Sequence, residues 1–199
     1  MVRVKNEERQ EIMEKTRQRL LEAAAMEIAH AGYPGANINT ISTAAGYAKG
    51  TIYNYFPSKL ALLLALIDAT AKEHLDFMLG KSRPETDPRR RLERFFQAGF
   101  EFVALHFPEA TVLFNTLNGS DETLKAHIFE AYQPLIQFLT SEILVPGIQQ
   151  GVFRPVEPSS TALLLMTIYM GTTSQHDAQG HPWLNPLQVV GLVLDGLHS

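Results

Sequence analysis

The sequence predicts an all-α fold in two parts, a small N-terminal domain of three helices and a larger helical C-terminal domain. In most segments apolar residues recur every three or four positions, and no strand-like alternation of useful length occurs. Glycine, proline and capping residues stand at the ends of these segments. With 199 residues, 45% of them hydrophobic, the chain is long enough to bury a substantial core.

The N-terminal helices follow from apolar spacing and from their end signals. Residues 16–31 carry one apolar stripe, and the helix should end at Gly32 because Pro34 follows. A short helix is expected from Asn37 to Gly46, and another from Lys49 to Phe56. A long helix should then run over 59–79, ending before Gly80.

The rest of the chain is expected to be helical after a polar hinge at 81–87. Pro134 should kink or split the predicted helix 121–149. These helices are predicted near 88–106, 109–117, 121–149, 158–176 and 186–198. The expected domains are therefore 1–58 and 81–199, linked by the helix 59–79.

Composition excludes several kinds of site. There is no cysteine, which rules out disulfides and thiolate metal ligands. The first ten residues are polar, and the apolar run 60–67 is too short to cross a membrane, so a cytoplasmic protein is expected. Phosphate-binding loops, zinc-protease helices and nucleophile elbows are all missing. We therefore expect no catalytic residues, no metal and no cofactor, and a protein that is not an enzyme.

Charge is unevenly distributed along the chain. The formal net charge is −4, but residues 1–60 hold eight basic and six acidic side chains, a local balance of +2. Attraction to phosphate depends on the local field rather than on the charge of the whole chain. The mild asymmetry permits an N-terminal DNA contact without requiring one.

Residues 36–59 carry the strongest functional pattern. Two short helices joined by a glycine-containing turn are typical of a helix-turn-helix. Helical spacing makes Ile52 and Phe56 the inward anchors of the second helix. The opposite arc can offer hydrogen bonds to bases and phosphates, bracketed by two lysines. Its residues are Gly50, Thr51 and Asn54, with Tyr53 and Tyr55 on the flanks and Lys49 and Lys59 at the ends.

The run from Lys49 to Phe56, followed by Ser58 and Lys59, resembles the DNA-binding signature of the TetR family of transcriptional regulators. The resemblance covers residues 16–67 and implies a ligand-responsive regulator of double-stranded operator DNA. Ala48 departs from the family pattern, which often has a capping serine there. The family implies DNA contacts from Thr51, Tyr53 and Tyr55, a phosphate contact from Lys59, and support from Asn37, Asn39 and Thr40.

Several motifs of the sequence also have a purely structural interpretation. Residues 36–59 could form an ordinary helical corner. The arginines 89–91 could face solvent, or could meet the DNA-binding domain or an acidic effector. His176, Asp177 and His181 could hold a metal, although they lie in a loop rather than at paired helical spacing.

The C-terminal part is rich in phenylalanine and methionine. Most such side chains form core, but some can line an apolar cavity between helices, where small ligands bind. We therefore expect an unidentified, largely apolar effector. The candidate pocket residues are Phe96, Phe100, Phe114, Tyr132, Met166 and Met170.

The last two predicted helices are apolar on most sides. One domain cannot easily cover that surface, so we expect a homodimer through residues 158–198. A dimer would present two recognition helices to a near-palindromic operator. The sequence thus predicts a repressor released from DNA by a small molecule. The alternative is a DNA-binding regulator with no effector.

Overall fold

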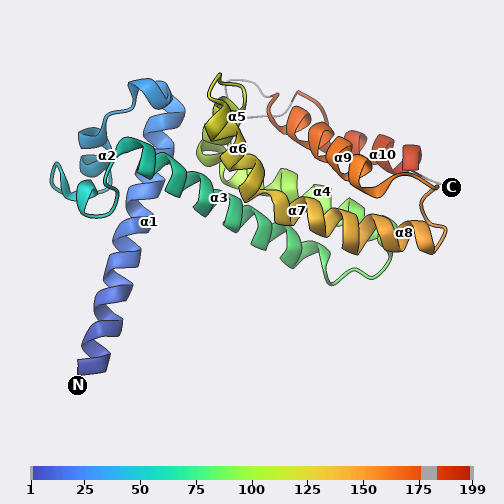
Figure 1. Ribbon diagram of the computed structural model, residues 1–199, viewed down its shortest axis with the longest axis horizontal. Helices are drawn as coiled ribbons and strands as arrows, with labels where there is room; N and C mark the ends of the chain where they lie inside the picture. The colour runs from blue at the N-terminus through green and yellow to red at the C-terminus, as the bar shows by residue number, and fades with distance from the viewer. Residues whose placement is uncertain (1, 176–182, 198–199) are drawn as a thin grey trace. The chain divides into compact units, whose positions relative to one another are not determined.

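Every regular element of the computed structural model is helical, within the residues that the structure describes, 2–175 and 183–197. The predicted all-α class is confirmed. In chain order the elements are α1 (Val2–Gly35), α2 (Ile38–Ala44), the 3-10 helix η1 (Thr51–Asn54), α3 (Lys59–Ser82), α4 (Pro88–Leu105), α5 (Phe107–Leu117), α6 (Glu122–Ala131), α7 (Gln133–Phe138), the π-helix η2 (Leu139–Leu144), α8 (Val145–Gln149), α9 (Pro158–Thr173) and α10 (Pro186–Leu197) (Figure 1).

Packing divides the chain into two compact units. The N-terminal unit groups the chain up to Thr70 with Pro108–Lys125. The second unit, called the effector unit after the effector that the sequence leads us to expect, groups Ala71–Phe107 with the chain from Ala126 onward. The units differ from the expected domains in two ways. Their boundary falls inside α3, and α5 belongs to the N-terminal unit.

The first helix begins much earlier than the predicted start at residue 16. Residues 6–15 of these extra turns are mostly polar and all exposed, and they carry pairs within one helical turn, such as Lys15 with Glu11 at 2.6 Å. A helix without a buried face has no apolar period, so the pattern could not reveal it. The predicted end at Gly32 is marked by a left-handed φ of 71° inside the assigned helix.

Two further boundaries differ from expectation. The helix α3 continues past Gly80 to Ser82, whose buried hydroxyl donates to the Met78 carbonyl at 2.7 Å. The single predicted segment 121–149 is divided into α6, α7, η2 and α8. The predicted break at Pro134 is confirmed, because this residue stands in the first turn of α7, where its missing N–H is not needed.

Each unit has its own apolar core. In the N-terminal unit α1 contacts α2, and α2 contacts η1. In the effector unit α4 contacts α9 and α10, and α7 contacts α9, so that these helices lie side by side (Figure 1). The largest fully buried side chains of the effector unit are Phe95, Phe96 and Phe102.

A glycine brings α4 and α9 together in the effector unit. A Cβ atom at Gly99 would lie 2.7 Å from the ring of Tyr169 and 2.9 Å from the methyl group of Met78. The Tyr169 hydroxyl donates to the carbonyl oxygen of Gly99 at 2.9 Å. The missing side chain therefore sets how closely the two helices approach.

We predict that Gly99→Ala lowers the free energy of unfolding by about 1–3 kcal/mol, because the added methyl group overpacks the core. Gly171→Ala is the matched control, since nothing lies within 4 Å of its Cβ position. In a helix that change should stabilise by about 0.5–1 kcal/mol. Urea denaturation followed by circular dichroism measures both, and equal stability of the two variants would contradict the proposed contact.

Candidate nucleic-acid interface and effector-unit core

The helix α2 is capped by Asn37. Its side-chain oxygen accepts the backbone N–H groups of Asn39 at 2.9 Å and Thr40 at 3.4 Å. Its own N–H donates to Glu27 on α1 at 3.0 Å. The side chains of Asn39 and Thr40 are exposed, whereas that of Asn37 is engaged at the helix end.

The turn after α2 depends on two glycines and a buried serine. Gly46 and Gly50 have φ values of 84° and 86°, a conformation that favours glycine. The hydroxyl oxygen of Ser42, which is fully buried, accepts the backbone N–H of Ile52 at 3.4 Å. The bond to Ser42 thereby holds the end of the turn against α2.

The predicted α-helix from Lys49 to Phe56 is wrong as to type and length. The structure has a 3-10 helix, Thr51–Asn54, with a Tyr53 N–H to Gly50 carbonyl bond of 3.1 Å. Ala48 offers no side-chain acceptor, and the N-cap residue Gly50 makes no side-chain bond. A helix start without a cap leaves orphan N–H groups, and the tighter 3-10 pattern satisfies some of them.

The two predicted anchors of this element are buried. Ile52 is 1% exposed and Phe56 is 4% exposed, as the helical spacing predicts. The guanidinium of Arg17 lies over the Phe56 ring, 5.6 Å from its centroid. The anchors therefore join the 3-10 helix to the core of the N-terminal unit.

The polar residues lie on the other side. Tyr53 is 55% exposed, and Asn54 and Lys49 are exposed. Gly50, Thr51 and Tyr55 are half-buried. A hydroxyl, an amide and an ammonium group thus face solvent close together, a combination suited to phosphate oxygens and base edges.

Lys59 is partly engaged within the unit. Its ammonium donates to the Pro34 carbonyl at 3.0 Å and lies 5.1 Å from the centroid of the Tyr33 ring. An ammonium has further N–H groups, which leaves donors for a phosphate. Sequence reasoning gave no packing role to Arg17, Ser42 or Tyr47. The structure shows one for each, and the Tyr47 hydroxyl donates to Thr16 at 3.2 Å.

Five of the six predicted pocket residues lie together in the structure. One apolar cluster of the effector unit contains the buried Phe96 and Met166, and against it pack the half-buried Phe100, Tyr132 and Met170. The remaining candidate, Phe114, stands on α5 in the N-terminal unit.

A polar group that sequence reasoning missed lies inside this cluster. His74 on α3 is 4% exposed, and its Nε2 lies 3.0 Å from the hydroxyl of Tyr169. Its Nδ1 lies 3.1 Å from the hydroxyl of Tyr132. Spacing could have found it, because Ala71, His74 and Met78 fall on one helical stripe.

The hydrogen bonds select one proton arrangement. Tyr169 donates its proton to the Gly99 carbonyl, so its oxygen accepts from Nε2 of His74. Nδ1 is then unprotonated and accepts from Tyr132. Burial, aided by nearby His106, lowers the pKa of His74 to about 3, and the imidazole is neutral.

The described residues offer neither a metal site nor a membrane span. No group of three or more His, Cys, Asp or Glu side chains is placed to hold a metal ion there. His176, Asp177 and His181 lie outside the described residues. Within the described part of the chain, no helix is both long and apolar enough to span a bilayer.

Sequence comparison finds relatives of this chain, and part of the N-terminal unit matches a known family. Residues 20–66 match the model of the family described as bacterial regulatory proteins, tetR family. The chain is 24% identical to an uncharacterised HTH-type transcriptional regulator, YhgD, of Bacillus subtilis, over 87% of this chain and 90% of that protein. It is 28% identical to the fatty acid metabolism regulator protein of the same species, over 68% and 69%.

Solved structures share the fold. The regulator FadR from Bacillus subtilis, in complex with stearoyl-CoA, superposes with a TM-score of 0.78 and 23% identity, over 92% of this chain and 97% of that one. AibR, in complex with isovaleryl coenzyme A and operator DNA, gives a TM-score of 0.74 and 21% identity, over 92% and 98%.

We predict that His74 makes stability fall in acid. The unfolded imidazole, with a pKa near 6.5, binds a proton that the folded one refuses until about pH 3. Stability contributed by the neutral histidine is complete above pH 6.5 and is lost as pH falls toward 3, with a slope of up to about 1.4 kcal/mol per pH unit.

Urea titrations between pH 7 and pH 4 measure that slope. In His74→Gln the dependence on pH should be shallower, whereas His30→Gln, at an exposed position, should match the wild type. Parallel profiles for wild type and His74→Gln would contradict the neutral buried imidazole.

Proposed function

The chain is a member of the TetR family of bacterial regulatory proteins, and we propose that it is a dimeric repressor that an acyl-coenzyme A releases from operator DNA. The observation that carries the DNA-binding part is the two-sided η1 turn. Its anchors Ile52 and Phe56 are buried, while Tyr53 and Asn54 face solvent. A protein built in this way works by binding rather than by catalysis, and we place it in the cytoplasm, where the DNA is.

We propose that residues 1–58 read the operator and that 81–199 hold the effector and the dimer interface. Tyr53, Asn54 and Thr51 would reach base edges or phosphates, and Lys49 and Lys59 would meet phosphates. The other proposed DNA contacts are Asn37, Asn39, Thr40, Gly50 and Tyr55. Asn37 would contribute chiefly by capping α2, because its side-chain oxygen is already engaged.

The dimer would form through 158–198. Within the described part of that range, Leu163, Leu164 and Leu192 are 43%, 59% and 75% exposed. Leu164, Ile168 and Leu192 line a groove of about 400 Å³ on α9 and α10, whose lining is largely apolar. A second copy would cover these leucines and would place two recognition elements about 34 Å apart, one turn of DNA.

The effector proposal rests on the relatives and on the core. FadR of Bacillus subtilis was solved with stearoyl-CoA, and AibR with isovaleryl coenzyme A. The acyl chain would contact Phe96, Phe100, Tyr132, Met166 and Met170. An apolar cluster with one small polar group, His74 and its two tyrosine hydroxyls, suits a thioester with a hydrocarbon tail. For Phe114 the proposal rests on the sequence alone.

Release would be a shift of population. The effector must favour a DNA-incompetent conformation by several kcal/mol, about 5.5 kcal/mol for a nearly complete switch. The helix α3 continues from the N-terminal unit into the effector unit and carries His74 in its second half. A ligand that disturbs the bonds of His74 would therefore act directly on the helix shared by the two units.

We predict that Tyr53→Ala weakens operator binding by at least about tenfold, or ~1.4 kcal/mol, without changing the melting temperature. The control is Met26→Ala, because Met26 is 62% exposed on α1 and points away from the buried stripe of that helix. Fluorescence anisotropy measures affinity for an operator selected from genomic DNA. An unchanged affinity for Tyr53→Ala would move the DNA surface elsewhere.

We predict that stearoyl-CoA dissociates the protein from this operator, whereas stearate and free coenzyme A do not. The same anisotropy assay, titrated with acyl-CoA of short to long chain, identifies the preferred length. Retention of DNA at saturating concentrations of every acyl-CoA would overturn the effector proposal while leaving the DNA-binding proposal intact.

We predict that Leu192→Glu converts the dimer to monomers, because it buries a charge in the proposed apolar interface. Leu105→Glu, at a leucine that is 64% exposed on α4, should leave the dimer unchanged. Sedimentation velocity distinguishes the two states. A Leu192→Glu protein that sediments as the wild type does would exclude this interface.

A further inference from the structure

The three arginines at the start of α4, residues 89–91, differ in their contacts. Arg91 donates to the backbone carbonyls of Glu85 at 2.6 Å, Glu142 at 3.1 Å and Arg83 at 3.3 Å. Arg89 pairs with Asp195 at 3.3 Å. The guanidinium of Arg90 has no hydrogen-bond or ion-pair partner among the described residues.

Arg94 stands one helical turn beyond Arg90 and is also without a partner within the described chain. Like charges four residues apart repel on a helix, and the N-terminal end of a helix disfavours cations. Arg90 is the third residue of the eighteen-residue α4. The two guanidinium groups weakly repel each other and the helix end, and a bound anion would relieve that repulsion.

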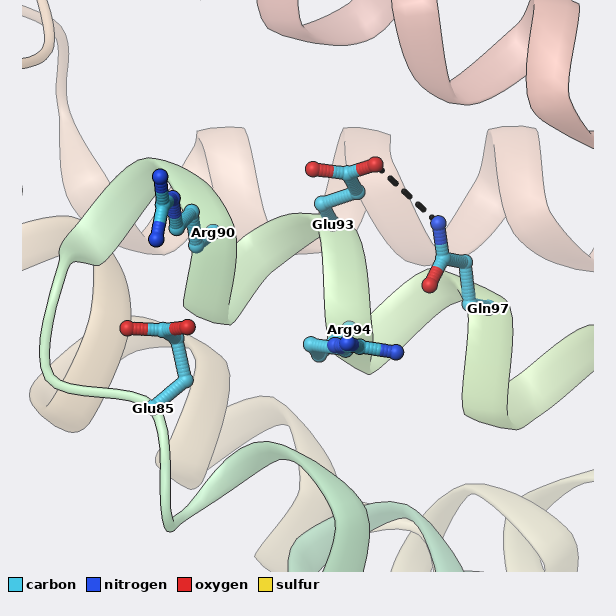
Figure 2. A pocket seen from close by; sticks show the side chains of 5 residues that line it. All are labelled: Glu85, Arg90, Glu93, Arg94 and Gln97. Atoms are coloured by element: carbon cyan, nitrogen blue, oxygen red, sulfur yellow. Dashed lines mark hydrogen bonds between the residues drawn. The ribbon is translucent and has the colours of Figure 1, made fainter.

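These arginines line an open polar pocket of about 290 Å³ together with Glu85, Glu93 and Gln97. Figure 2 shows Arg90, Glu93, Arg94 and Gln97 along α4, with Glu85 coming from the preceding loop. The loop is held in place by the bonds of Arg91 to its carbonyls. The pocket therefore has a wall fixed by Arg91 as well as two cations.

The two carboxylates of the pocket are partly occupied. Oε1 of Glu85 accepts the backbone N–H groups of Thr86 at 2.9 Å and Asp87 at 3.1 Å. Oε1 of Glu93 accepts the amide of Gln97 at 3.1 Å. Neither carboxylate pairs with an arginine of the pocket. The unused hydrogen-bonding capacity consists of the guanidinium N–H donors and one free oxygen on each glutamate.

We propose that this pocket binds a phosphate ester, with Arg90 and Arg94 on the phosphate oxygens. Guanidinium groups match phosphate in geometry and charge, and the free carboxylate oxygens can accept from hydroxyl or amino groups next to it. A nucleotide has that combination of groups. The site would hold the phosphorylated nucleotide end of the acyl-coenzyme A, and this assignment rests on the function proposed above.

The experiment measures acyl-CoA affinity by calorimetry on the full-length protein. Arg90→Gln combined with Arg94→Gln should weaken stearoyl-CoA binding at least tenfold, and should leave binding of stearoyl-pantetheine, which lacks the nucleotide, unchanged. Arg89→Gln is the control, because it removes the same charge in the same turn but from a residue outside the pocket. Thermal melting checks that each variant is folded.

The outcomes separate this inference from the proposed function. If stearoyl-CoA binds the wild type and the double variant equally, or if Arg89→Gln weakens binding as much, the pocket assignment is overturned while the effector proposal stands. If no acyl-CoA binds, inorganic phosphate and 3′-phosphoadenosine 5′-phosphate are titrated alone. Binding that needs Arg90 and Arg94 would support a site for a free phosphate compound, and no binding would overturn both proposals.

Discussion

The attachment of η1 to α2 is the constraint on which the proposed DNA-binding surface depends. Ile52 is held twice, by burial of its side chain and by the bond from its N–H to the Ser42 hydroxyl. Because the turn is short, fixing Ile52 and Phe56 also fixes the direction in which Tyr53 and Asn54 point. An element too short to be stable alone is thus oriented by tertiary packing.

In the effector unit, tertiary packing likewise fixes a polar group, the buried His74. His74 is neutral because it is buried, among groups from other parts of the chain. These groups are the hydroxyls of Tyr132 and Tyr169 and the ring of Phe102, whose centroid lies 4.2 Å from that of the imidazole. No buried side-chain nitrogen or oxygen in the described residues lacks a partner. A network that is satisfied in only one proton arrangement has few alternative packings, so a ligand that breaks one bond disturbs its neighbours.

The run 89–91 illustrates why like residues in sequence need not act alike. Arg91 and Arg90 are neighbours on the helix. The guanidinium of Arg91 donates to backbone carbonyls of a loop, whereas that of Arg90 has no partner among the described residues. Which of them is structural depends on which side of α4 faces the neighbouring carbonyls. That side is set by the apolar stripe of α4, with Leu92, Phe95 and Phe96 all fully buried.

Sequence alone determined the helical class, the anchors Ile52 and Phe56, the break at Pro134 and the polar arc around Tyr53, because each follows from local spacing and from the stereochemistry of glycine and proline. Tertiary structure decided the rest. It made the proposed recognition element a 3-10 helix, buried His74 between two tyrosines, and placed Phe114 in a different unit from the other pocket candidates. These features depend on contacts between residues distant in the chain, about which a local period carries no information.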